Sequence, residues 1–371
     1  AGFEGNLRRN MDKPSTDVST MHNRSLFCRY VASAYPEAQD DKPYPGPITE
    51  ADWWDNFVEE IAYSGQDYVA MNCRGEANID HGRPDKLHDL MAAIKHKGVE
   101  HEFKIAIFDD TPASWSAARN AHKGYGYDNK PFKNGSRVEG SHYPLLFLDP
   151  EKEDMKGANN DFRKEVYYYI WDANLKPSFE NVPRDYWFEI DGRPVILFWN
   201  PNGFLQDSEL MKKDPVKYKS TTGLDETKSD AYNGKLSYIL KCISDDFNST
   251  FGVRPFLIIQ REWTDRDYSL VNCPYLDGIH NWFAVPTMDM TEEVYNENLL
   301  YNTYISAYNF KGFSVGSGCP GFVQGDLARP NWQFIDADHG RYATKMMESF
   351  LAKKPDLVFL EGFTDLAENA A

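Results

Sequence analysis

The last residues of the chain join several acidic side chains to an apolar run. The segment Phe359–Ala371 reads FLEGFTDLAENAA, and its carboxylates are Glu361, Asp365 and Glu368. Asp365 and Glu368 are three residues apart, so a helical turn would bring both to one face. Two neighbouring carboxylates cannot both ionise freely, so one can donate a proton while the other stays charged. The segment is either a solvated chain end or an acid–base site with Glu368 as general acid, Asp365 as base, nucleophile or substrate-assisting group, and Glu361 in support.

Other polar and aromatic residues stand where apolar, strand-like runs end. The candidates for substrate contacts are Asn72, Asp109, Asp110, Trp199, Asn200, Glu262, Trp263, His280, Trp282 and Gln324. Glycosidic cleavage needs this combination, because carboxylates supply the acid and the base and aromatic faces support sugar rings. The positions show no Ser-His-Asp order, glycine cradle or His cluster with metal spacing, so we expect neither a cofactor nor a metal.

Each candidate also has a purely structural interpretation. Asp109 and Asp110 could cap the segment that follows them, and Glu262 could form an ion pair with Arg261. The tryptophans could belong to the core, and His280 could be a buried imidazole with satisfied hydrogen bonds. The residue types alone do not decide between these roles.

Apolar runs and amphipathic stretches alternate along the chain. The expected strands are 25–35, 67–72, 103–110, the second arm of a hairpin over 186–200, 254–263, 276–283, 313–318 and 357–362. Helical spacing of apolar residues predicts helices around 54–61, 87–98, 162–170, 236–247, 298–310 and 342–350. The polar segment 111–160 is too long for a plain connection, which indicates a functional insertion.

This order of elements predicts an α/β protein with a (β/α)8 TIM barrel, formed by residues 1–371 as one domain. The strands are apolar on both faces, as parallel strands covered by helices are. An open doubly wound sheet is the other candidate fold. Such a sheet would be expected to carry a glycine-rich phosphate-binding loop after an early strand, and the sequence has none. Few residues follow Gly362, so the last helix would be incomplete and we expect a trimmed chain.

Composition narrows the class of partner. The formal net charge of −17 argues against nucleic acid or an anionic membrane as partner. No apolar stretch is long enough to span a membrane. The five cysteines show no CxxC, and a Cys28–Cys73 disulfide is conceivable. The first residues lack a hydrophobic signal core, which indicates the start of a mature or trimmed chain. We expect a monomer that works in an extracellular or periplasmic setting.

Several strand-end motifs resemble those of glycoside hydrolase family 71, the α-1,3-glucanases. They are GQDYVAMN, FKIAIFDD, LDGIHNWFAVP and FTDLAEN. The resemblance implies substrate contacts at Asp109, Asp277 and Trp282, and it places Asp365 and Glu368 on the family's catalytic pair. The related family 99 endo-α-mannosidases carry a similar pair of carboxylates. The chain looks closest to an uncharacterised bacterial domain family of this kind.

The expected function is therefore hydrolysis of an α-linked glucan or mannan type polysaccharide or oligosaccharide by carboxylate acid/base catalysis. A carbohydrate-binding barrel without catalysis is the main alternative. A lyase or a metal-dependent hydrolase on the same fold is a further one, since fold alone does not choose the reaction.

Overall fold

The computed structural model describes residues 50–73, 84–111, 167, 170–199, 235–281, 309–319, 322–324, 333–335 and 340–360. These residues belong to two compact units. The first contains the described parts of Ala1–Ser64, Ala92–Val99 and Gly278–Ala371, and the second those of Gly65–Met91 and Glu100–Asp277.

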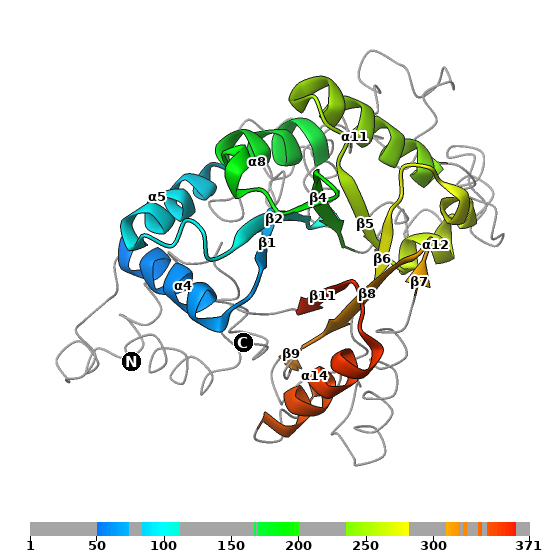
Figure 1. Cartoon of the computed structure of the whole chain (residues 1–371). Helices are drawn as coiled ribbons and strands as arrows, with labels where there is room; N and C mark the ends of the chain where they lie inside the picture. The colour runs from blue at the N-terminus through cyan, green and yellow to red at the C-terminus, as the bar shows by residue number, and fades with distance from the viewer. Residues whose placement is uncertain are drawn as a thin grey trace, which may run out of the picture. The chain divides into compact units, whose positions relative to one another are not determined.

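The second unit is built on parallel strands. β1 (Tyr68–Cys73), β2 (Lys104–Asp109), β4 (Arg193–Phe198) and β5 (Phe256–Gln260) lie side by side in this order (Figure 1). β4 and β5 are almost wholly buried, because Val, Ile, Leu and Phe fill both faces of these strands. The expected strands 67–72 and 103–110 are confirmed, and the protein is α/β with a parallel sheet. Of the expected strand 254–263, Phe256–Gln260 form β5, whereas Glu262 and Trp263 are helical.

A hairpin joins β3 (Glu189–Ile190) to β4 in antiparallel pairing. Its turn is Asp191–Gly192, where both residues have positive φ angles of 52° and 70°. Such a two-residue turn matches the twist of the strands it joins, and Asp-Gly tolerates these angles. The predicted hairpin is confirmed.

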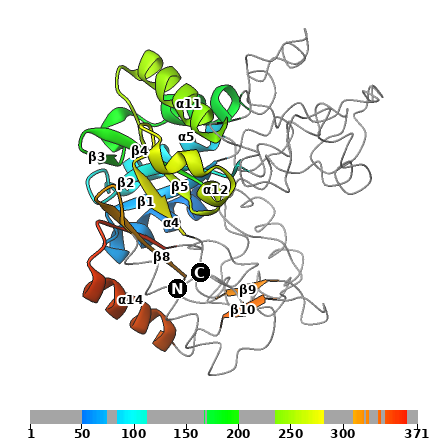
Figure 2. The ribbon, with the colours of Figure 1, turned by 90° about the vertical axis from the view of Figure 1, so that its right-hand side faces the viewer.

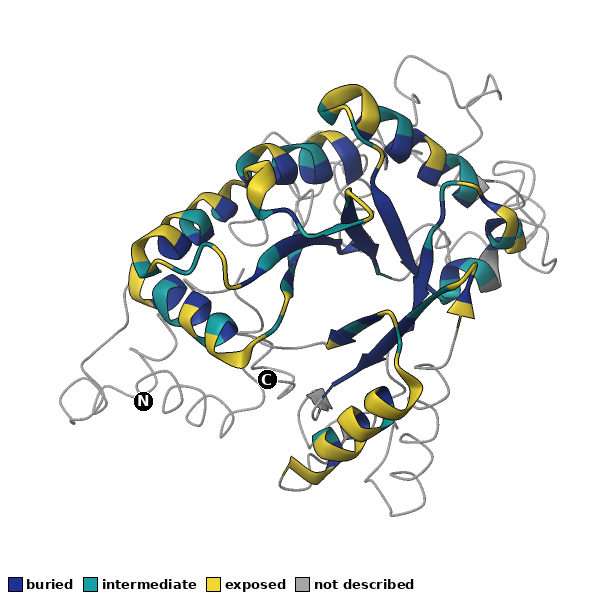
Figure 3. Ribbon diagram, in the orientation of Figure 1, coloured by how far each residue is buried: buried dark blue, intermediate teal, exposed yellow. Residues whose placement is uncertain are grey.

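Two helical segments of the second unit bury their apolar residues. η6 (Trp171–Leu175) is a π-helical turn that continues into α8 (Lys176–Asn181). α11 (Lys235–Phe251) lies with α8 on one side of the strands (Figure 1), and its apolar face is buried (Figure 3). Between these helices, Phe179 packs edge-on against Phe247 and Trp187, with ring centroids 4.8 and 5.1 Å apart. The remaining helical elements are η2 (Pro84–Lys86), η7 (Arg184–Tyr186), α12 (Glu262–Arg266) and η9 (Tyr268–Asn272).

In the first unit, α4 (Glu50–Ser64) buries the predicted stripe of Trp54, Phe57, Val58 and Ile61. The end of α5 (Leu87–Lys97) is held to α4 by a hydrogen bond and an ion pair. His96 Nδ1 lies 2.8 Å from the carboxylate of Asp55, and Lys97 Nζ lies 2.6 Å from that of Glu59.

The strands of the first unit include β6 (Gly278–His280), β7 (Asn309–Phe310), β8 (Phe313–Gly318) and β11 (Leu357–Leu360). β8 pairs in parallel with β11 and antiparallel with β7. β9 (Phe322–Gln324) pairs with β10 (Gln333–Ile335), and Figure 2 shows these two strands side by side. α14 (Arg341–Lys353) approaches β8 closely: a Cβ on Gly318 would meet the Met346 sulfur, and one on Gly316 would crowd the Phe350 ring. Glycine at these two positions therefore lets the helix pack on the strand.

Some expectations need correction. Asn309 and Phe310, expected at the end of a helix, form strand β7. Met347, next to the buried Met346, is 41% exposed, so it does not belong to the buried stripe of α14. Cys73 is a free, buried thiol, which contradicts the Cys28–Cys73 disulfide. The expected strand 25–35 and most of the insertion 111–160 lie outside the described residues.

The described residues do not show a closed barrel, so closure stays a prediction. Within the same residues, no helix is both long and apolar enough to cross a lipid bilayer.

Candidate functional site

The register of the parallel strands shows which side chains near their carboxyl ends lie on the same face of the sheet. Cys73 pairs with Asp109, and Asp109 with Phe198, so these residues share one face. Asn72 pairs with Phe108 on the other face. We call them the helix face and the inner face, because helical residues contact the first.

Asp109 lies on the helix face and is fully buried. Its carboxylate accepts a hydrogen bond of 2.6 Å from Asn174 Nδ2, in the π-helical turn, and one of 2.9 Å from Thr111 Oγ1. Asn174 Nδ2 also donates to the Cys73 carbonyl at 3.0 Å, and Ser178 Oγ donates to Asn174 Oδ1 at 3.4 Å. This network turns Asp109 away from the inner face. The side chain of Asp109 therefore joins strand to helix, and a contact between Asp109 and substrate stays a prediction.

The thiol of Cys73 lies in the same network. Burial raises its pKa to about 12, the nearby carboxylate of Asp109 contributes in the same direction, and a hydrogen bond with Ser178 opposes the rise. Cys73 is therefore a neutral thiol at physiological pH and unsuited to act as a nucleophile.

Asp110 continues the ladder one residue beyond β2. Its amide donates to the Cys73 carbonyl at 3.3 Å, and the Trp199 amide donates to the Asp109 carbonyl at 3.1 Å. The alternation of side chains then places Asp110 and Trp199 on the inner face, level with Gln260 at the end of β5. We call Asp110, Trp199 and Gln260 the strand-end row.

The members of the strand-end row differ in exposure. Asp110 and Gln260 are each 3% exposed, whereas Trp199 is half-buried. Asn72 lies on the same face, one level lower on the neighbouring strand β1, and is also half-buried. The row offers a carboxylate, an indole and an amide side by side, which suits a ligand with both polar groups and a flat apolar face.

Trp263 is part of the core. It is fully buried, its indole Nε1 donates to the Trp199 carbonyl at 2.6 Å, and its ring lies 5.7 Å from that of Phe198 on the helix face. Its ring has no exposed surface in the described structure, and a substrate contact at Trp263 stays a prediction. Glu262 begins α12 just after β5 and is half-buried.

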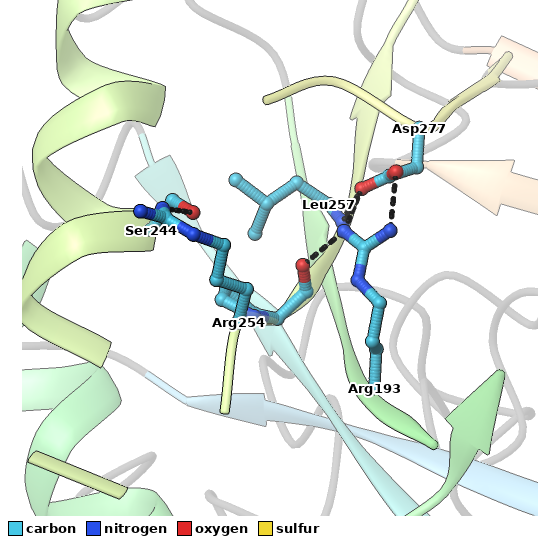
Figure 4. Close-up of polar contacts among 6 residues, drawn as sticks. Arg193, Ser244, Arg254, Leu257 and Asp277 are labelled. Carbon is cyan, nitrogen blue, oxygen red and sulfur yellow. Dashed lines mark hydrogen bonds and ion pairs between the residues drawn. The ribbon is translucent and has the colours of Figure 1, made fainter. Parts of the chain in front are cut away.

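Asp277 lies at the amino-terminal ends of β4 and β5, beside Arg193 and Leu257 (Figure 4). Arg193, at the start of β4, donates to both carboxylate oxygens of Asp277 at 2.7 and 2.6 Å and to the Pro255 carbonyl at 2.5 Å. Asp277 also accepts from the Leu257 amide at 3.0 Å, near the start of β5. Asp277 and Arg193 therefore form a structural clamp at the amino-terminal ends of β4 and β5, and a role of Asp277 in substrate binding stays a prediction.

In the first unit, His280 ends β6 and is fully buried, with its ring edge-on to Phe359 of β11 at 5.5 Å. The amide of the next residue, Asn281, donates to Ser317 Oγ of β8 at 3.4 Å. A contact between His280 and substrate stays a prediction.

Several predicted site residues are not placed. Asn200, Trp282, Glu361, Asp365 and Glu368 lie outside the described residues, and of Gln324 only its position at the end of β9 is described. Among the described side chains, no group of three or more His, Cys, Asp or Glu residues is arranged to hold a metal ion.

Sequence reasoning missed Asn174, Ser178 and Arg193, and it did not select Gln260 from the strand ends. Asn174 and Ser178 are four apart, a helical spacing that hints at a shared face. No local signal identifies Asp109 as their partner, since the contact spans sixty-five residues.

These features define a parallel α/β protein with polar residues gathered at the carboxyl ends of its strands. The chain belongs to the family described as "Domain of unknown function (DUF5010)", whose model matches residues 1–371. The expected membership in a domain family without an assigned function is confirmed.

Two solved structures of a GH99 endo-alpha-mannosidase from Bacteroides thetaiotaomicron are similar to the chain. The structure in complex with BIS-TRIS-Propane has 12% identity and a TM-score of 0.42, covering 88% of this chain and 75% of that one. A second structure of that enzyme has 12% identity and a TM-score of 0.41, with coverage of 88% and 72%. A likeness at this level indicates neither substrate nor mechanism. Among curated proteins, no sequence matches the chain.

Proposed function

We propose that this protein is a glycoside hydrolase that cleaves an α-linked glucan or mannan type polysaccharide or oligosaccharide. The observation that carries the proposal is the strand-end row, because it joins the Asp110 carboxylate, the Trp199 indole and the Gln260 amide on the inner face. Sugar rings present an apolar face and a rim of hydroxyl groups, which an aromatic ring and polar acceptors can bind together.

The proposed catalytic residues come from the end of the chain. Glu368 acts as the general acid, Asp365 as base, nucleophile or substrate-assisting group, and Glu361 as a supporting carboxylate. Asn72, Asp110 and Trp199 contact the substrate, and Asn200, Glu262, His280, Trp282 and Gln324 are proposed to extend the site. The resemblance of LDGIHNWFAVP and FTDLAEN to motifs of glycoside hydrolase family 71 supports the roles of Trp282, Asp365 and Glu368.

The proposed fold is one (β/α)8 barrel, in which active sites gather at the carboxyl ends of the strands. β1, β2, β4 and β5 are parallel, and the strand-end row lies at the carboxyl ends of β2, β4 and β5. We further propose that the protein is a monomer and works outside the cytoplasm.

The test is release of reducing ends from purified polysaccharides. We expect release from an α-1,3-glucan or an α-mannan and none from cellulose, whose linkage is β. If the protein binds an α-linked glycan but releases nothing from any substrate, the non-catalytic binding barrel is the better description.

A further inference from the structure

Two buried amide oxygens in the second unit accept no hydrogen bond from any described residue. They are Asn72 Oδ1, near the end of β1, and Gln260 Oε1, at the end of β5. Gln260 is 3% exposed, so solvent does not reach it freely. A buried acceptor without a donor costs folding free energy, and such groups in native proteins need an explanation.

Both oxygens belong to the inner face. Asn72 is level with Phe108 and Leu197, and Leu197 is level with Ile258. Gln260 follows Ile258 by two residues and therefore shares that face. Gln260 also lies one strand spacing, about 4.8 Å, from Trp199 in the strand-end row.

A third amide gives the contrast. Asn174, also fully buried, donates to Asp109 and to the Cys73 carbonyl and accepts from Ser178. Its hydrogen bonds are therefore satisfied within the protein, on the helix face. The amide of Asn174 on the helix face thus has hydrogen-bond partners within the protein, whereas the amide oxygens of Asn72 and Gln260 on the inner face have no donor among the described residues.

We propose that Gln260 Oε1 and Asn72 Oδ1 accept hydrogen bonds from hydroxyl groups of the bound substrate, which makes Gln260 a further substrate contact. The identity of the donor as a sugar hydroxyl rests on the proposed function. The pair also sets specificity. A carboxylate offers no donor hydrogen to these oxygens and would be repelled by Asp110, so neutral sugars bind here and uronic acids do not.

The experiment compares Gln260→Met and Asn72→Leu with the intact protein. Each variant keeps the size of the side chain and removes the acceptor. Isothermal titration calorimetry measures the affinity for short α-1,3-linked gluco-oligosaccharides, α-linked manno-oligosaccharides and oligogalacturonate. Chromatography of the same samples reports cleavage, and thermal unfolding of the free protein reports stability.

We expect the intact protein to bind a neutral oligosaccharide and not oligogalacturonate. Each variant should lose about tenfold in affinity, while the melting temperature stays the same or rises because a buried unsatisfied oxygen has been removed. Asn174→Leu is the matched control and should lower the melting temperature, since it removes the buried amide that donates to both Asp109 and the Cys73 carbonyl.

The inference is overturned if Gln260→Met binds as tightly as the intact protein. It also fails if this variant is destabilised as strongly as Asn174→Leu, or if the intact protein prefers oligogalacturonate or binds none of the oligosaccharides. Binding that depends on Gln260 without cleavage would contradict only the proposed hydrolysis. Cleavage with unchanged affinity in Gln260→Met would contradict only this inference.

Discussion

Asn174 donates a hydrogen bond of 2.6 Å to the carboxylate of Asp109, and this contact separates the roles of two adjacent aspartates. Asp109 is held on the helix face, so Asp110, one residue later, belongs to the inner face with Trp199 and Gln260. The acidic pair in the sequence therefore supplies one structural residue and one candidate substrate contact.

Replacement of Asn174 by Leu should destabilise the protein by about 2–3 kcal/mol, because it removes two buried hydrogen bonds, one to the Asp109 carboxylate and one to the Cys73 carbonyl. Urea unfolding measures the change. Asn181→Leu is the control: it removes one hydrogen bond, to the Pro84 carbonyl, and should cost only about 1 kcal/mol. Equal stability of the Asn174 variant and the intact protein would show that the network contributes nothing.

The Arg193–Asp277 clamp should stabilise the fold without affecting catalysis. Arg193→Met leaves the Asp277 carboxylate, whose side chain is only 16% exposed, without its bidentate partner. We expect a loss of about 2 kcal/mol, below the usual cost for a buried pair because Arg193 is 32% exposed. A double-mutant cycle with Asp277→Asn should show coupling of at least about 0.5 kcal/mol.

Lys241→Met is the control for the clamp. It breaks an exposed ion pair with Asp245 on α11 and should leave the free energy of unfolding unchanged. Additive losses in the cycle, or a changed hydrolysis rate in folded Arg193→Met, would contradict the structural role of the clamp.

The sequence predicts the strands of the second unit well, because their signals are local, whereas it misses β7, β9 and β10. Continuous apolar runs mark β2, β4 and β5, and Asp191–Gly192 marks the hairpin turn. The contacts that a side chain makes at a strand end depend on residues that are distant in the sequence, so the local sequence does not predict them. Asp109 and Trp263 look like site residues in the sequence, and contacts with Asn174 and the Trp199 carbonyl make them structural. Asp277 directly precedes β6. Its position at the amino-terminal ends of the strands depends on its hydrogen bond with the Leu257 amide of β5, which the local sequence does not indicate.

The two tryptophans near the ends of β4 and β5 should respond differently to replacement. Trp199→Ala should raise KM more than it lowers kcat, because stacking on a sugar stabilises ground and transition states alike. The free energy of unfolding of this variant should change by less than about 1 kcal/mol, since the backbone carbonyl of residue 199 still accepts a hydrogen bond from Trp263. Trp263→Ala should destabilise the core by about 3–5 kcal/mol. Thermal unfolding and steady-state kinetics measure both effects, and the reverse pattern would exchange the assigned roles.

Cys73 should make stability fall at alkaline pH. Its thiol has a pKa of about 12 in the folded protein against an ordinary value of 9.0. The folded state therefore keeps this proton while the unfolded state releases it. The associated stability is fully present below pH 9.0 and is lost as the pH rises toward 12, with a slope approaching about 1.4 kcal/mol per pH unit.

Urea unfolding of the intact protein and of Cys73→Ala, at a series of pH values above 8, isolates this contribution. The intact protein should lose stability more steeply with rising pH. Parallel curves for the two proteins would contradict the raised pKa of the thiol.

The proposed hydrolysis is tested most directly by the kcat of Asp365→Asn and Glu368→Gln on the α-linked polysaccharide that the intact protein cleaves. An acid–base pair predicts that each amide variant loses about 10²-fold or more in kcat, with unfolding temperatures like that of the intact protein. If both variants keep near-normal rates while Asp110→Asn or Glu262→Gln abolishes turnover, then other strand ends carry the catalytic residues and the assignment of Asp365 and Glu368 is wrong.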